Sequence, residues 1–273
     1  MAERTALRTD TPRRNAPART ALPRTWPLLA DQIRYQMGLL LRTPRAISTG
    51  LALPVLLLLL SDGSRGHLPA AHVAGLATLG VTMSAWTTHG ISLVAAREAG
   101  VLKRWRATPL PRWCYFAGRM VATVVVATMA GAITIGVAAV LFRTPVGPGA
   151  VAELLGVFAL GALACAAACT AVTSFVPNVA SAFPVLGLTY LPVVLISGAL
   201  GSPAAVPDWL VRVTDFLPIR PITEAAADSL PGHGVPLTSI VVLACWVAAG
   251  LVAALATFRW EPTRPRQKRP ART

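Results

Sequence analysis

The chain has 273 residues, of which 54% are hydrophobic and only 13% are charged, and its mean hydropathy is +0.59. A soluble fold of this size could not bury so much apolar surface, so the composition excludes an ordinary water-soluble protein. The net charge of +14 would indicate a nucleic-acid partner in a soluble chain. Here the long uncharged stretches between basic segments indicate membrane spans instead, and no nucleic-acid role is expected.

The basic residues are concentrated in three segments. Of the 25 Lys and Arg residues, nine precede Ala46, six lie between Arg97 and Arg119, and six lie from Arg259 onward. Cytoplasmic loops of membrane proteins carry an excess of Lys and Arg, so the three segments are expected on the cytoplasmic side. Both termini are therefore predicted to be cytoplasmic.

Three regions are distinguished along the chain. Residues 1–25 are rich in Arg, Thr, Ala and Pro and lack large apolar residues, which predicts a disordered cytoplasmic tail. Residues 26–260 form the predicted transmembrane domain, and residues 261–273 form a basic cytoplasmic tail. At the start of the domain, residues 27–41 predict an amphipathic helix with Leu29, Ile33 and Met37 on one face, which we expect to lie in the membrane interface rather than to pack as a soluble helix.

The hydropathy pattern predicts an all-α integral membrane protein with six transmembrane helices. Five stretches are long enough to cross a bilayer, whereas the first is short, since its 16 uncharged residues cover about 24 Å. The predicted spans are 46–61, 71–96, 115–142, 150–175, 179–201 and 237–258. Alternation from a cytoplasmic N-terminus then places every arginine-rich segment inside.

Two further patterns concern helix packing and the segment before the last span. Gly161, Cys165, Cys169 and Thr173 recur every four residues, which favours close helix contact; a thiol pair between the two cysteines is the alternative. The region 202–236 is apolar and punctuated by prolines, which is unusual for a solvated loop. We expect it to re-enter the membrane from outside, where neighbouring helices would cover its backbone.

Catalytic chemistry has few candidates. The sequence has no phosphate-binding G-x-x-x-x-G-K pattern, no metal-ligand spacing among its cysteines and no Asp/Glu/His relay through the spans. His89 is the only histidine placed within a span, near its inner end; it is expected either to line a cavity or, preferentially, to be an interfacial, hydrogen-bonded histidine. The chain is therefore predicted not to be an enzyme and to bind no metal.

Two motifs carry a resemblance to a known family. The inner loop after the second span contains Arg97, Glu98, Gly100, Val101, Leu102, Trp105 and Pro109, in the order R-E-x-G-x-L…P. The outer segment contains Ile196, Ser197, Gly198, Pro203, Pro207, Trp209, Leu210, Leu217 and Pro218, in the order I-S-G…P…P-x-W-L…L-P. Both motifs, in this order among the spans, resemble the type-2 permeases of ATP-binding-cassette (ABC) transporters, which include bacterial drug and polysaccharide exporters.

The resemblance implies a permease subunit of an ATP-driven exporter in a bacterial cell membrane. Two permease subunits, identical or different, would form the pathway, and separate cytosolic ATPase subunits would bind ATP and Mg²⁺, so this chain itself would hold no cofactor. The 97–110 loop would couple the permease to the ATPase, and cargo would pass along the second and fifth spans, with His89, Thr189 and Ser197 as candidate lining residues. An ATP-independent secondary transporter or channel is the alternative.

Overall fold

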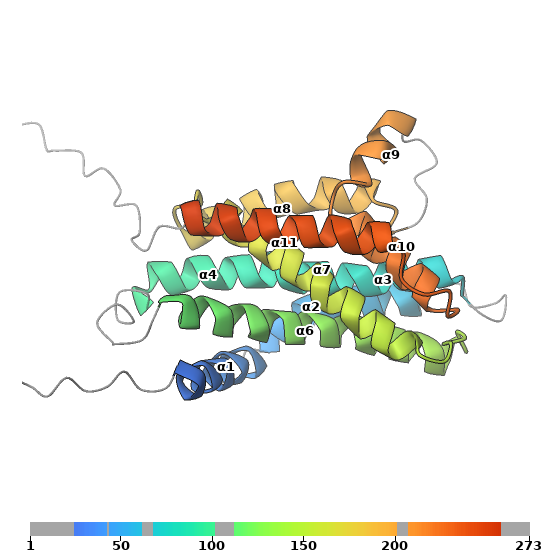
Figure 1. Cartoon of the computed structure of the whole chain (residues 1–273), viewed down its shortest axis with the longest axis horizontal. Helices are drawn as coiled ribbons and strands as arrows, with labels where there is room; N and C mark the ends of the chain where they lie inside the picture. The colour runs from blue at the N-terminus through green and yellow to red at the C-terminus, as the bar shows by residue number, and fades with distance from the viewer. Residues whose placement is uncertain (1–24, 43, 62–67, 102–111, 201–206, 258–273) are drawn as a thin grey trace, which may run out of the picture.

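The computed structural model describes residues 25–42, 44–61, 68–101, 112–200 and 207–257. Throughout these ranges the secondary structure is helical and contains no strand, which confirms the predicted all-α class for this part of the chain. The predicted tails, apart from Thr25, lie outside the described residues. Most helices run side by side along one bundle, as Figure 1 shows.

The chain enters the bundle through α1 (Thr25–Leu41), which packs against α6 (Arg112–Leu141). The predicted helix at 27–41 therefore exists, but the stripe buried most deeply is polar, because Gln32 and Gln36 are each only 3% exposed. Gln32 fits against Gly118 of α6, where a Cβ atom would lie 2.7 Å from its Cγ. The apolar face predicted from the sequence is only partly buried beside this stripe.

The next two segments are α2 (Pro44–Leu59) and a long helical run from Ala70 to Glu98. The run consists of α3 (Ala70–Met83), one π-helical turn η2 (Ser84–Thr88) and α4 (His89–Glu98), without interruption. It covers the predicted second span. In α2 the apolar stretch Gly50–Leu59 is shorter than a typical span, in agreement with the short first span expected from the sequence.

Four helices of the described chain are long and apolar enough to cross a membrane: α6, α7 (Ala150–Thr173), α8 (Val179–Ile196) and α11 (Leu237–Thr257). Their bounds agree with the predicted third to sixth spans to within a few residues, except that α8 ends at Ile196 rather than 201. Pro184 and Pro192 both lie inside α8, whose helical assignment nevertheless continues across them.

The core of the bundle surrounds α7, the most buried of these four helices. It contacts α3, α4, η2, α6, α10 and α11. The predicted small-residue stripe lies in these contacts: Gly161 fits against Ile222 of α10, and Cys169 fits against Gly90 of α4. Small side chains thus allow the backbones to approach, as is common between membrane helices.

The segment before the last helix forms α9 (Asp208–Thr214) and α10 (Ile219–Ser229). α9 projects from the end of the bundle, whereas α10 is packed among α3, α7 and α11 (Figure 1). This end is opposite the one where α1 lies and where α4 ends. The apolar, proline-rich stretch therefore contains a short helix buried against the bundle rather than a solvated loop.

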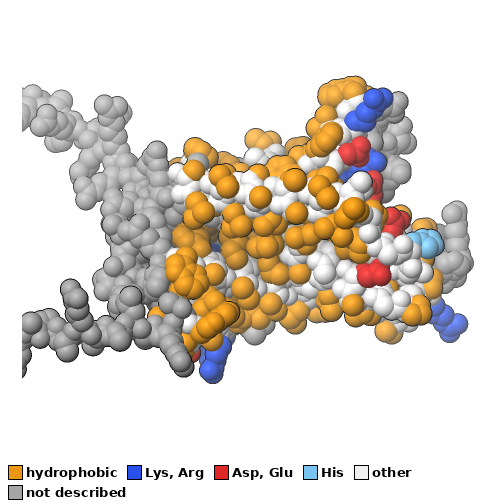
Figure 2. All heavy atoms as spheres, viewed as in Figure 1, with side chains coloured by type: hydrophobic (Ala, Val, Ile, Leu, Met, Phe, Trp, Pro, Cys, Tyr) orange, Lys and Arg blue, Asp and Glu red, His pale blue; other side chains and the backbone are white. Residues whose placement is uncertain are grey.

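The described outer surface between the two ends is largely apolar (Figure 2). Large apolar side chains on the helix flanks are strongly exposed, among them Phe183 (70%), Leu188 (78%) and Leu255 (84%). Charged side chains in this view gather toward the ends of the bundle. An exposed apolar band bounded by charges is typical of a protein surrounded by lipid.

The close approach of α11 to α7 at Gly250 predicts that a larger side chain at this position destabilises the protein. A Cβ atom at Gly250 would lie 2.8 Å from the Ala168 backbone nitrogen, which cannot move without displacing α7. Gly250→Ala should therefore lower the midpoint of thermal unfolding of the purified protein, at a cost of about 1–3 kcal/mol. The matched variant Gly136→Ala, where a Cβ meets nothing within 4 Å, should be neutral or stabilising. Equal midpoints for the two variants would contradict the close contact.

Candidate functional site

The last residues of α4 hold the turn between α7 and α8. The Arg97 side chain is buried, and its Nη2 donates hydrogen bonds to the carbonyl oxygens of Thr173, at 3.1 Å, and Val176. Thr173 is the last residue of α7, whose terminal carbonyls have no partner within the helix. Burial lowers the pKa of the Arg97 guanidinium from its ordinary value, but arginine stays protonated in proteins, so a cation caps the negative end of the α7 dipole.

Glu98 makes the complementary contact on the other side of the turn. Its Oε2 accepts a hydrogen bond of 2.9 Å from the backbone nitrogen of Val179, the first residue of α8. A carboxylate at a helix N-terminus is stabilised by the unpaired N–H groups and by the dipole. Arg97 and Glu98 thus bracket the turn 174–178, with each charge placed at the helix end of opposite sign. We call these two contacts the α4 bracket.

Gly100 ends α4. Its φ of +68° is in the left-handed region, and its nitrogen donates to the Arg97 carbonyl, as in the helix termini that favour glycine. The following Val101 is partly buried. Leu102, Trp105 and Pro109, the other residues predicted for coupling, lie outside the described residues.

At the other end of the bundle, the predicted outer motif begins with the turn that ends α8. The Ser197 hydroxyl donates to the Val194 carbonyl and accepts from the Ala199 nitrogen, and Gly198 adopts a φ of +78°. Ala199 is packed tightly on Gly75 of α3, where a Cβ would overlap the Ala199 backbone. The motif therefore fixes the end of α8 to α3.

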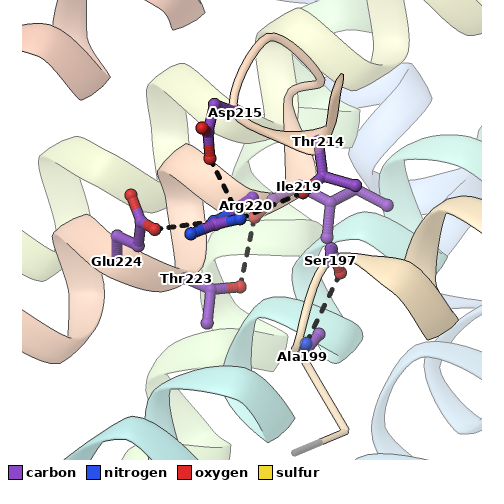
Figure 3. Close-up of polar contacts among 8 residues, drawn as sticks. All are labelled: Ser197, Ala199, Thr214, Asp215, Ile219, Arg220, Thr223 and Glu224. Atoms are coloured by element: carbon purple, nitrogen blue, oxygen red, sulfur yellow. Dashed lines mark hydrogen bonds and ion pairs between the residues drawn. The ribbon is translucent and has the colours of Figure 1, made fainter. Parts of the chain in front are cut away.

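The remaining motif residues border α9 and α10. Pro207 precedes α9, Trp209 is 66% exposed on it, and the buried Pro218 precedes α10; Pro203 lies outside the described residues. Behind the motif, Arg220 joins the two short helices: it pairs with Asp215 at 3.0 Å and Glu224 at 2.7 Å and donates to the Thr214 hydroxyl (Figure 3). The outer segment is thus held as one unit by its own charges.

A small cavity of about 70 Å³ lies beneath this outer segment. Its walls come from η2, α7, α8, the turn before α10, and α11. They are formed by Trp86, Cys165, Thr189, Tyr190, Val193, Leu217, Pro218, Ile219 and Trp246. Thr189 is one of these residues, whereas His89 and Ser197 are not; that any of the three lines a transport pathway stays a prediction.

The polar groups around the cavity are few. The Thr189 hydroxyl donates its hydrogen to the Val185 and Leu186 carbonyl oxygens within α8. The Tyr190 hydroxyl forms a hydrogen bond of 2.9 Å with the Thr82 hydroxyl. The Trp246 indole donates to the Phe216 carbonyl at 2.6 Å. The Trp86 indole N–H is buried without a hydrogen-bond partner, and the cavity walls are almost wholly apolar, so the cavity suits an apolar molecule.

His89 lies in a buried polar cluster between α4, α6 and α7. Its Nδ1 is 2.8 Å from the Thr123 hydroxyl, and its Nε2 is 3.1 Å from the Thr170 hydroxyl. Since Thr170 donates its one hydroxyl hydrogen to the Ala166 carbonyl, it must accept from His89 Nε2–H, while Nδ1 is within hydrogen-bond distance of the Thr123 hydroxyl. Both ring nitrogens thus have a partner, which agrees with the preferred prediction of a hydrogen-bonded histidine.

The cluster also contains a buried cation. The Arg119 side chain is 6% exposed, and its Nη2 donates to the Ser92 hydroxyl and, at 3.4 Å, to the His89 carbonyl. Its Nε is buried with no partner. From the sequence, Arg119 is counted only among the basic residues around the inner loop, although it lies inside the predicted third span, because hydropathy does not show which side chains turn inward.

Comparisons with known proteins agree with the two motifs. Residues 30–230 match the model of the family described as ABC-2 type transporter. The chain is also 25% identical, over 152 residues, to the probable multidrug ABC transporter permease YbhR of Escherichia coli K12, and equally to that of Escherichia coli O157:H7. The aligned stretch is 56% of this chain and covers 40% of the length of those relatives.

The family model spans well over half of the chain, including every helix that supplies the α4 bracket and most of those around the cavity. The apolar, membrane-spanning helices agree with this assignment. The chain therefore belongs to the ABC-2 type transporter family.

Proposed function

We propose that the chain is the membrane-spanning subunit of an ATP-driven ABC exporter, working as a dimer with separate cytosolic ATPase subunits. In this arrangement α2 and the run α3–η2–α4 supply two crossings in addition to α6, α7, α8 and α11. The termini and the end of α4 then face the cytosol of a bacterial cell. Family membership and the distribution of Lys and Arg support this topology.

The α4 bracket is the observation that carries the proposed coupling. The segment that follows Gly100 is where the ATPase would dock, and the two residues just before it are bonded to the turn between α7 and α8. A displacement of the docked segment would therefore move the start of α8 directly. Since α8 also forms a wall of the cavity through Thr189, Tyr190 and Val193, the same helix would change the shape of the cavity.

The proposed cargo is apolar or amphiphilic. The cavity is lined mainly by apolar and aromatic side chains, as small-molecule sites usually are. The multidrug designation of the relatives is compatible with such a cargo.

Coupling is tested with the exposed member of the bracket. Glu98→Ala removes the acceptor for the Val179 nitrogen and should reduce co-purification of the ATPase and ATP-dependent transport at least about threefold, while size-exclusion elution stays unchanged, because the residue is at the surface. Trp105→Ala, at the predicted anchor of the docking segment, should weaken ATPase recovery further.

The matched control for coupling is Glu224→Ala, an exposed carboxylate at the opposite end, which should leave ATPase recovery unchanged. Normal transport and normal ATPase recovery in both Glu98→Ala and Trp105→Ala would refute the coupling role. If the wild-type chain transports cargo but recovers no ATPase, the ATP-independent alternative is correct.

Topology is tested by thiol labelling in intact cells. In a variant whose four native cysteines are replaced by alanine, His233→Cys, in the exposed turn before α11, should react with an impermeant maleimide. Arg34→Cys, on the exposed side of α1, should react only after the cells are opened. The reverse pattern would refute the proposed orientation.

The dimer is tested by cross-linking two differently tagged copies in native membranes. Each copy exposes apolar side chains along α8, including Phe183, Leu188 and Leu191. We expect a cross-linked pair that contains both tags. An active particle that holds a single permease chain and no second membrane subunit would contradict the proposal.

A further inference from the structure

A second cavity lies on the flank of the bundle, away from the cavity beneath the outer segment. It has a volume of about 240 Å³ and lies between α7 and α11, with Ala225 of α10 among its lining residues. The two helices touch closely at Gly250 and Ala167. Toward their N-terminal ends they leave a groove between Gly156 of α7 and Ile240 of α11, two exposed residues. We call it the α7–α11 groove.

The groove is apolar except for two side chains, Glu153 and Ser239. Oε2 of Glu153 is buried and accepts no hydrogen bond, and within the described ranges the Glu153 side chain forms no ion pair. A buried carboxylate oxygen without a donor is costly. The position of Glu153 in the first turn of α7 explains why a negative charge is tolerated there, but the dipole supplies no donor to this oxygen.

Charge and size restrict the occupant. An anion would be repelled by Glu153, and a divalent metal ion would need more oxygen ligands than one carboxylate and one hydroxyl. A zwitterionic phospholipid would bring a phosphate, yet no Lys, Arg or His lines the groove. A singly charged ammonium on an apolar body meets each condition, because its N–H groups can donate to Glu153 and Ser239 while the body packs on Val157, Leu160 and Leu243.

We propose that the α7–α11 groove binds lipophilic amines, with the Glu153 carboxylate pairing with the ammonium group. The mouth of the groove lies beside the exposed apolar side chains of Val151, Leu155 and Val241, which a membrane would cover. An amphiphilic amine dissolved in the bilayer could therefore enter from the side without crossing water. This binding does not depend on the proposed ATP-driven export.

The test measures binding of radiolabelled dodecylamine to the full chain, immobilised in maltoside detergent without any ATPase. Wild type should bind saturably, and Glu153→Gln should raise the Kd at least about tenfold, as expected for loss of a charge-assisted hydrogen bond in a poorly hydrated site. Gly156→Leu should raise the Kd similarly, because the leucine side chain would fill the groove. The variant should still fold, since a Cβ at position 156 meets nothing within 4 Å and leucine favours the helix. Dodecanol should compete poorly with dodecylamine.

The matched control is Asp228→Asn, which removes a carboxylate of α10 that does not line the groove and should change the Kd less than twofold. An unchanged Kd in Glu153→Gln, or equal competition by dodecanol, would overturn the proposal. Lipids that co-purify with each variant are identified by mass spectrometry. Phosphatidylethanolamine retained by wild type but lost from Glu153→Gln, with no dodecylamine binding to either, would show a phospholipid site and would also overturn it.

Discussion

Close backbone contact around α7 is the constraint on which the rest of the structure depends. In a bilayer, apolar helices gain little from leaving lipid for protein, so helix association relies on tight packing and interhelical hydrogen bonds. α7 provides both: Gly161 admits Ile222 of α10, and Ala167 admits Gly250 of α11. Its hydroxyl side chain at Thr170 bonds to His89 of α4. The neighbouring helices are thereby held at fixed positions relative to α7, which allows small cavities to persist between them.

α8 connects the two ends of the molecule. Its first residue, Val179, is bonded to Glu98, and its wall of the cavity begins ten residues later at Thr189, a distance of about 15 Å along a helix. Few hydrogen bonds join α8 to the rest of the bundle between these points, and much of its surface is exposed. A helix fixed at its ends and lightly packed along its length can transmit a displacement more readily than the buried α7 could.

Much of this architecture follows from hydropathy and charge alone. The bounds of α6, α7 and α11 were predicted to within a few residues, because long apolar runs leave few alternatives in a membrane. The partners of Arg97 and the inward position of Arg119 could not be predicted from the sequence, since their contacts lie about 76 and 27 residues away along the chain. Likewise Gln32 faces α6 because Gly118 leaves room, a fit that helical periodicity cannot show.

The π-helical turn Ser84–Thr88 has a consequence for how α3 and α4 work together. A single π turn inserts about one extra residue, and each residue of a helix turns the chain by about 100°. The side-chain phase of α4 is therefore offset from that of α3, so that Trp86 reaches the cavity while Arg97 still meets the end of α7. Relaxation of this π-helical turn into regular α-helix would rotate and shift α4 about its own axis. Arg97 and Glu98 would then no longer align with the turn between α7 and α8.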